Sequence, residues 1–110
     1  MESKLLVIVA SGDKDTALAG LMYTRNALVN KWLDRVRVVF FGPSEKLVAL
    51  HNDVRPFLKE ITARCECFAC KAISDEEGIS ERLEEAGVKV EYVGTIVSNA
   101  LKEGYLPMVW

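Results

Sequence analysis

Residues 4–10 read Lys-Leu-Leu-Val-Ile-Val-Ala and are followed at once by Ser11-Gly12-Asp13. This apolar run is short, does not alternate with polar residues and is rich in β-branched side chains, which is typical of a central parallel strand covered on both faces. Asp13 or Asp15 can then cap a helix that continues to about Asn30. The opening of the chain therefore predicts a strand followed by a helix.

The rest of the chain repeats this alternation of strand and helix. Further strands are predicted at residues 36–41, 65–69, 88–93 and 105–110, and helices at residues 44–50, 54–63, 75–86 and 95–103. Ser44 and the Ser74/Glu77 pair fit helix N-caps, and Gly87 and Gly104 fit left-handed helix C-caps. Strands that alternate with helices indicate a doubly wound α/β fold, with a parallel sheet of about five strands between helices on both faces.

The first helix is predicted to pack through one apolar face. The residues that recur near the helical period are Leu18, Leu21, Met22, Leu28, Val29 and Trp32. Arg25 projects into this stripe. Either its stem packs while its guanidinium reaches water, or the guanidinium meets another subunit or a bound anion.

Composition and charge narrow the classes of function. The chain has 110 residues, of which 50% are hydrophobic, and this suits a single globular domain over residues 1–110. Its formal net charge of -2 provides no attraction for nucleic acid or for an anionic membrane. No apolar run approaches the roughly 20 residues that span a bilayer, and the first residues do not resemble a secretory signal. We therefore expect a cytoplasmic protein that binds neither nucleic acid nor membrane.

The three cysteines lie together in residues 65–70, Cys-Glu-Cys-Phe-Ala-Cys, in the third predicted strand. Cys70 falls where this strand ends and the chain turns towards a helix, at the edge where ligands and reactive groups gather in open α/β sheets. Gly12 and Gly42 are predicted to lie along the same edge. Lys71 and a helix N-terminus would stabilise a thiolate at Cys70, whereas the carboxylates of residues 75–77 would oppose it. From the residues alone, Cys70 is either a reactive thiol or a small buried apolar side chain.

The other two cysteines have weaker claims to a role in chemistry. Cys65 and Cys67 share one face of the predicted strand and are interpreted as structural. Cys67 and Cys70 have the Cys-x-x-Cys spacing of dithiol redox sites, so a reversible disulfide between them is a second interpretation. It requires the two Cα atoms to lie within roughly 7 Å of each other. Three thiols and the distant His51 do not supply the four ligands of a structural zinc site, so we expect no metal within one chain.

Other common sites find no support in the sequence. Ser11-Gly12-Asp13 lacks the glycine spacing of dinucleotide sites and the lysine of a P-loop, and it is interpreted as a tight turn with a helix cap. His51 lies in a predicted loop beside Asn52 and Asp53, which favours a solvated surface group. No base is placed near a serine for a hydrolase triad. No organic cofactor is predicted.

Four segments match the pattern of a known family over nearly the whole chain. They are the opening Leu-Leu-Val-Ile-Val-Ala-Ser-Gly, the Val-Val-Phe-Phe-Gly-Pro of residues 38–43, the cysteine segment, and the closing Glu-Gly-Tyr. The most specific match is Cys70 at the end of the third strand with Gly78 eight residues later. With these residues the chain resembles the DsrE/DsrF-like (YchN/TusD-like) family of small sulfur-relay proteins. The resemblance implies a flavodoxin-like, three-layer α/β/α domain that assembles as a homotrimer or homohexamer.

In that family the cysteine matched by Cys70 is thought to hold sulfur as a persulfide and to pass it to a partner. The resemblance thus implies a sulfur carrier or sulfurtransferase subunit, with a sulfur donor or acceptor protein as its partner. Lys71, Gly12 and Gly42 would support Cys70 at the same edge. The alternative is a non-catalytic oligomeric binding or assembly module in which Cys70 is merely packed. A lesser alternative is a thiol redox sensor that uses Cys67 and Cys70.

Overall fold

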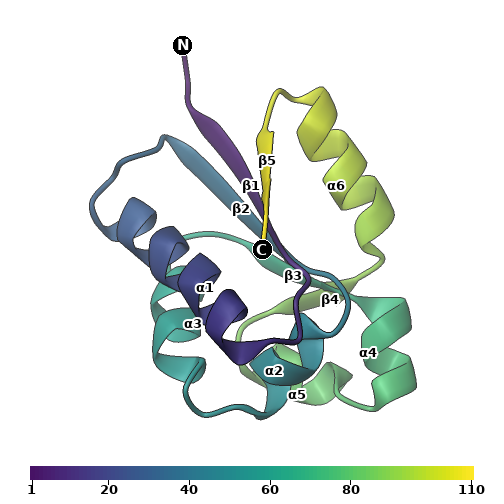
Figure 1. The fold of residues 1–110 in the computed structure, drawn as a ribbon. Coiled ribbons are helices and arrows are strands. Elements are labelled where there is room, and N and C mark those ends of the chain that lie inside the picture. The colour runs from purple at the N-terminus through teal and green to yellow at the C-terminus, as the bar shows by residue number, and fades with distance from the viewer.

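The computed structural model describes residues 1–110 and contains a five-stranded parallel sheet with the strand order β4-β3-β2-β1-β5 (Figure 1). The strands are β1 (Lys4–Val9), β2 (Arg35–Phe40), β3 (Cys67–Cys70), β4 (Lys89–Glu91) and β5 (Leu106–Val109). The helices are α1 (Lys14–Val29), α2 (Ser44–Leu50), α3 (Arg55–Thr62), α4 (Lys71–Glu77), α5 (Ser80–Glu85) and α6 (Val93–Lys102). No helix among these combines the length and the apolar character needed to cross a bilayer.

Strand β1 is an inner strand of the sheet, because it pairs with β2 on one side and β5 on the other. Its residues Leu6, Val7 and Val9 are completely buried. Successive side chains of a strand point to opposite faces, so an unbroken apolar run satisfies two covered faces at once. The prediction from residues 4–10 is confirmed, although the middle position of the sheet belongs to β2.

Helices cover both faces of the sheet. On one face, α1, α2, α3 and α5 pack on the larger apolar cluster, to which the strands contribute Val7, Val38 and Cys67. On the other face, α6 packs on a smaller cluster that contains Leu6 and Cys70. Figure 1 shows α1 and α3 side by side on one side of the sheet and α6 on the other. The predicted three-layer α/β/α, flavodoxin-like fold is confirmed.

Helix α1 packs through only part of the predicted stripe: Leu21 is buried and Leu18 and Leu28 pack against the larger cluster. Met22, Val29 and Trp32 are about half exposed. The buried residues are mostly small: Ala17, Gly20, Leu21, Thr24 and Ala27. The physical reason is a close approach, since a Cβ atom on Gly20 would lie 2.6 Å from the Trp110 ring. Small side chains let the helix come close, and the larger apolar side chains are left beside the contact.

Two predicted helix caps are wrong. Ser44 is the first residue of α2 rather than its cap, and its buried hydroxyl donates a hydrogen bond to the carbonyl oxygen of Val9. Ser74 lies inside α4, which begins at Lys71. Its Oγ is hydrogen-bonded to Oγ of Ser80 at 2.7 Å. Both hydroxyls therefore join neighbouring elements instead of capping a helix.

The helix predicted over residues 75–86 is divided into α4 and α5. Gly78 ends α4 in the left-handed conformation, with φ +70°. This conformation is inexpensive for glycine and interrupts the helical hydrogen bonds. Ile79 follows and is buried, so the break turns an apolar side chain into the core.

Candidate functional site

Cys70 is the last residue of β3 and directly precedes the first residue of α4. Its side chain is 8% exposed and belongs to the apolar cluster on the α6 face, together with Val39 and Phe68. Ile73 of α4 packs against the same cluster. The position at the strand end agrees with the sequence prediction. A thiol here is shielded by apolar side chains and opens only narrowly to solvent.

Glu45, in the first turn of α2, is completely buried. Its Oε2 accepts a hydrogen bond from the backbone N–H of Gly42 at 3.1 Å, whereas its Oε1 has no hydrogen-bond partner. Burial raises the pKa of Glu45 from 4.5 to about 7; the backbone N–H groups of Gly42 and Cys70 oppose this rise, and Glu77 adds to it. The carboxyl group thus links the ends of β2 and β3 and can exchange a proton near neutral pH.

The sequence interpretation did not single out Glu45. The sequence does contain a pattern that points to Glu45. A carboxylate follows the turn Gly42-Pro43 in the first turn of a predicted helix, where free backbone N–H groups need hydrogen-bond acceptors. What the pattern does not reveal is the burial, because α4 packs across α2 only in the folded protein.

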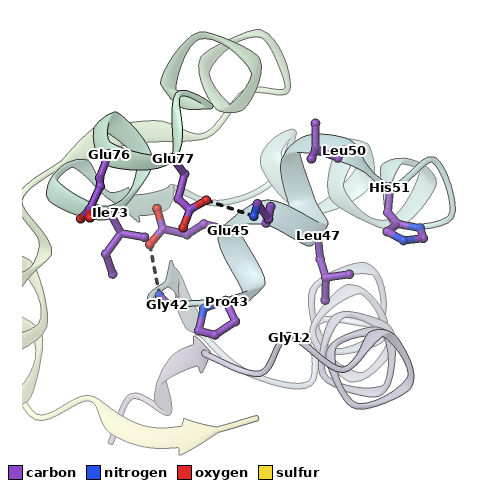
Figure 2. Close-up of a pocket in the computed structure, with 11 residues that line it drawn as sticks. Gly12, Gly42, Pro43, Glu45, Leu47, Leu50, His51, Ile73, Glu76 and Glu77 are labelled. Atoms are coloured by element: carbon purple, nitrogen blue, oxygen red, sulfur yellow. Dashed lines mark hydrogen bonds and ion pairs between the residues drawn. The ribbon is translucent and has the colours of Figure 1, made fainter.

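A pocket of about 780 Å³ lies beside Glu45 at the carboxyl edge of the sheet. Figure 2 shows the Glu45 side chain extending from α2 towards Ile73 of α4, with the Glu77 carboxylate close by. The lining residues come from the turns after β1 and β2 and from α2 and α4: Gly12, Gly42, Pro43, Glu45, Lys46, Leu47, Leu50, His51, Ile73, Glu76 and Glu77. Gly12 and Gly42, both predicted from the sequence, line this pocket, whereas Cys70 and Lys71 are not among its lining residues.

Lys71 forms an ion pair with Asp75, four residues later on α4, at 2.8 Å. The contact raises the pKa of Lys71 and lowers the pKa of Asp75. The ammonium group is therefore engaged by its own helix, and this pair competes with the predicted support of a Cys70 thiolate.

The predicted Cys67–Cys70 disulfide is excluded by this fold. Cys67 belongs to the cluster on the α1 face and Cys70 to the cluster on the α6 face. Three residues along a strand also separate Cα atoms by about 10 Å, beyond the reach of a disulfide. All three cysteines are free thiols. Cys65 lies in the bend before β3 rather than inside the strand, so the third strand begins two residues later than predicted.

The remaining charged candidates have ordinary surroundings. The guanidinium of Arg25 lies over the ring of Phe57, 4.9 Å from its centroid, and 3.5 Å from Glu60. Arg25 thus packs between α1 and α3, as the first of its two interpretations states for the stem, but its guanidinium contacts side chains of α3 instead of reaching water alone. His51 is exposed at the end of α2, on the rim of the pocket. No three His, Cys, Asp or Glu side chains lie close enough together to hold a metal ion.

No protein-family model and no curated protein matches this sequence. Among solved structures, the conserved protein of unknown function BT1422 from Bacteroides thetaiotaomicron superposes with a TM-score of 0.90 at 24% identity, covering 98% of this chain and 95% of that one. MTH1491 from Methanobacterium thermoautotrophicum, also of unknown function, gives a TM-score of 0.81 at 20% identity over 99% and 100% of the two chains. The YchN protein of E. coli gives 0.74 at 17% identity over 97% and 99%.

The chain has the fold of these three proteins. Because the matches extend over almost the full length of each pair, they include the sheet, its strand order and the edge where Cys70 lies. YchN is a member of the family that the sequence resembles, so the resemblance is supported at the level of the fold.

Proposed function

We propose that this protein is a small sulfur carrier in which Cys70 holds sulfane sulfur as a persulfide and passes it to the thiol of a partner protein. The observation that carries the proposal is the position of Cys70 at the carboxyl end of β3, the edge at which parallel α/β sheets present reactive groups. The fold shared with YchN adds support. Such a protein would act as a sulfurtransferase subunit and requires neither a metal nor an organic cofactor.

The proposed transfer is an exchange at sulfur. The Cys70 thiolate attacks the sulfane sulfur of a donor, a new S–S bond forms, and the donor leaves as a thiolate. A thiolate of the acceptor protein then attacks the outer sulfur, the S–S bond to Cys70 breaks, and Cys70 leaves as a thiolate. Each step replaces one S–S bond by another, so no oxidant or reductant is consumed.

The surroundings of Cys70 suit a persulfide. Apolar neighbours such as Val39, Phe68 and Ile73 restrict the access of water and of small thiols that would remove the sulfur. Glu45 faces the Cys70 backbone with a carboxyl group whose pKa is raised to about 7. It can take up or release a proton while the thiol changes its charge state.

Intact-protein mass spectrometry after incubation with a polysulfide donor tests this proposal. We expect a mass gain of one or more sulfur atoms that dithiothreitol removes, with fragment spectra locating the sulfur on Cys70. The Cys70→Ser variant should lose this labelled position, whereas the matched Cys65→Ser variant should keep it. A wild-type protein that gains no sulfur on Cys70 would contradict the proposal.

A second candidate function is that of an oligomeric assembly module, which is favoured by apolar side chains at the surface. Leu106 and Val109 on the edge strand β5 are 72% and 65% exposed, and Tyr92 is 66% exposed. Apolar side chains on an edge strand are typical of surfaces that another chain covers. We therefore also propose a homotrimer or homohexamer, a state that is compatible with sulfur carriage.

A further inference from the structure

The pocket beside Glu45 is separate from the Cys70 thiol, because neither Cys70 nor Lys71 lines it. Its volume of about 780 Å³ lies within the range of sites for small molecules, roughly 300–1,000 Å³. Its walls come from the turns after β1 and β2 and from α2 and α4. A concave site at the carboxyl edge of the sheet is a place where open α/β proteins bind ligands.

The pocket has an acidic end and an apolar end. Figure 2 shows the side chains of Glu45, Glu76 and Glu77 together at one end. Leu47 and Leu50 of α2 line the opposite end. A ligand that fills this space must therefore combine a polar or charged group with an apolar body.

Negative charge exceeds positive charge at the acidic end. One lysine, Lys46, lines the pocket, and its Nζ lies 3.1 Å from Oε2 of Glu77. Neither Glu45 nor Glu76 forms an ion pair with a lysine or an arginine. The histidine of the pocket, His51, lies at the apolar end (Figure 2). This distribution of charge favours a cation over an anion as the charged group of a ligand.

Glu45 has an unused hydrogen-bonding atom at this end. Its Oε2 accepts a hydrogen bond from the N–H of Gly42 at 3.1 Å, whereas its buried Oε1 has no partner. A buried carboxyl oxygen without a donor is costly, and proteins rarely keep one. An ammonium group supplies three donors and a positive charge. It would therefore satisfy the oxygen and compensate the carboxylate at the same time.

A ligand reaches Glu45 past the side chain of Glu77, which lies close to it in Figure 2. Glu77 and its partner Lys46 have side chains that are 43% and 61% exposed. Ion pairs between side chains this exposed contribute little stability, so the ammonium group of a ligand can replace Lys46 beside Glu77. Glu77 also raises the pKa of Glu45 through its negative charge. The two carboxyl groups are thus near enough for one cation to interact with both.

We propose that this pocket binds a small primary amine with an apolar body. The ammonium group lies among the carboxylates of Glu45, Glu76 and Glu77, and the apolar body packs against Leu47 and Leu50. The proposal does not depend on the proposed sulfur carriage.

NMR titration of the full chain with hexylamine tests this proposal, at a pH above the Glu45 pKa of about 7. Hexanol and hexanoate are the matched probes, because they have the same apolar chain with a neutral and an anionic head group. We expect hexylamine to bind about tenfold more tightly than either. The backbone amide signals of Gly42 and Ile73 should shift, which places the amine in this pocket.

Variants that remove one charge separate this site from a general attraction of amines to an acidic protein. Glu45→Gln and Glu76→Gln should each weaken the binding of hexylamine several-fold. Glu85→Gln, at an exposed position of α5 outside the pocket, should leave it unchanged. Glu45→Gln retains an oxygen that accepts from the N–H of Gly42, so the turn beside the pocket is preserved.

A second pair of variants tests the apolar end. Leu50 and Leu101 are 48% and 47% exposed, and only Leu50 lines the pocket. Leu50→Ser should weaken the binding of hexylamine, whereas Leu101→Ser should not.

The proposal is overturned if millimolar hexylamine shifts no signal from the pocket, or if hexanol or hexanoate binds as tightly as hexylamine. It is also overturned if Glu85→Gln weakens binding as much as Glu76→Gln. Cys70→Ser should bind hexylamine like the wild type. Because sulfur loading is read on Cys70 and amine binding at the pocket, failure of one proposal is distinguishable from failure of the other.

Discussion

The buried carboxyl group of Glu45 accepts a hydrogen bond from the backbone N–H of Gly42 at 3.1 Å. Gly42 has φ +107°, so the turn after β2 directs its N–H back to the first turn of α2. The N–H of Cys70, at the end of the neighbouring strand, acts on the same carboxyl group. One buried acid therefore connects two strand ends at the edge where the proposed sulfur site lies.

This acid should make stability depend on pH. Burial raises the pKa of Glu45 from 4.5 to about 7, so the folded protein retains a proton that the unfolded chain releases between these two values. The proton on Glu45 makes its full contribution to the free energy of unfolding below pH 4.5. This contribution is lost as the pH rises from 4.5 to about 7, and above pH 7 the free energy of unfolding no longer changes through this group. Glu45→Gln should remove this decline and raise the free energy of unfolding above neutral pH by about 3 kcal/mol.

Urea unfolding at a series of pH values measures this effect. Glu76→Gln provides the matched control, because Glu76 lines the same pocket but is exposed. A Glu45→Gln protein that retains the wild-type pH profile would show that another group is responsible.

Two glycines should respond to alanine in opposite directions. Gly42 has φ +107°, a conformation that an L side chain rarely adopts, although a Cβ atom there would meet only the carbonyl oxygen of Ala10 at 3.6 Å. Gly42→Ala should therefore cost about 1–3 kcal/mol through backbone strain. Gly94 is in the first turn of α6, and its Cβ would meet nothing within 4 Å, so Gly94→Ala should stabilise by about 0.5–1 kcal/mol. Equal shifts of the two urea midpoints would contradict the strain argument.

Gly20 should be sensitive for a steric reason. A Cβ atom there would lie 2.6 Å from Cγ of Trp110, so Gly20→Ala must displace the indole or the helix. We expect a loss of about 1–3 kcal/mol in the free energy of unfolding. The fluorescence of Trp110, recorded in a Trp32→Phe background, should shift at the same time. Wild-type fluorescence in the Gly20→Ala protein would refute the close contact.

The edge strand offers a test of assembly. Leu106 on β5 is 72% exposed, so replacing it by lysine removes apolar surface without opening the core. If β5 contributes to a homotrimer or homohexamer, Leu106→Lys should shift the mass in light scattering towards that of the monomer. Asn99→Lys, at an exposed position of α6, adds the same charge without removing apolar surface and is the control for the change of charge. A wild-type protein that is monomeric at micromolar concentration would argue against the assembly module.

Much of the fold follows from local patterns. The unbroken apolar residues 4–10 predict an inner parallel strand because both of its faces must be covered. The turn signals that follow each strand predict where the strands end, and Cys70 is found at such an end. The interpretation of Cys67 and Cys70 as a disulfide pair was wrong. The sequence could have shown this, because residues three apart in a strand point to opposite faces. The caps at Ser44 and Ser74 were wrong because a serine before a helix and a serine inside it have similar local sequence.

By itself, the sequence determined the order of strands and helices, the parallel sheet and the strand end that carries Cys70, because these depend on the periodicity of neighbouring residues. Only the tertiary structure decided that Glu45 is buried beside a pocket and that Gly20 meets Trp110. These features depend on contacts between segments distant in the chain. Burial, and with it the pKa of a carboxyl or a thiol, is a property of those contacts rather than of the local sequence.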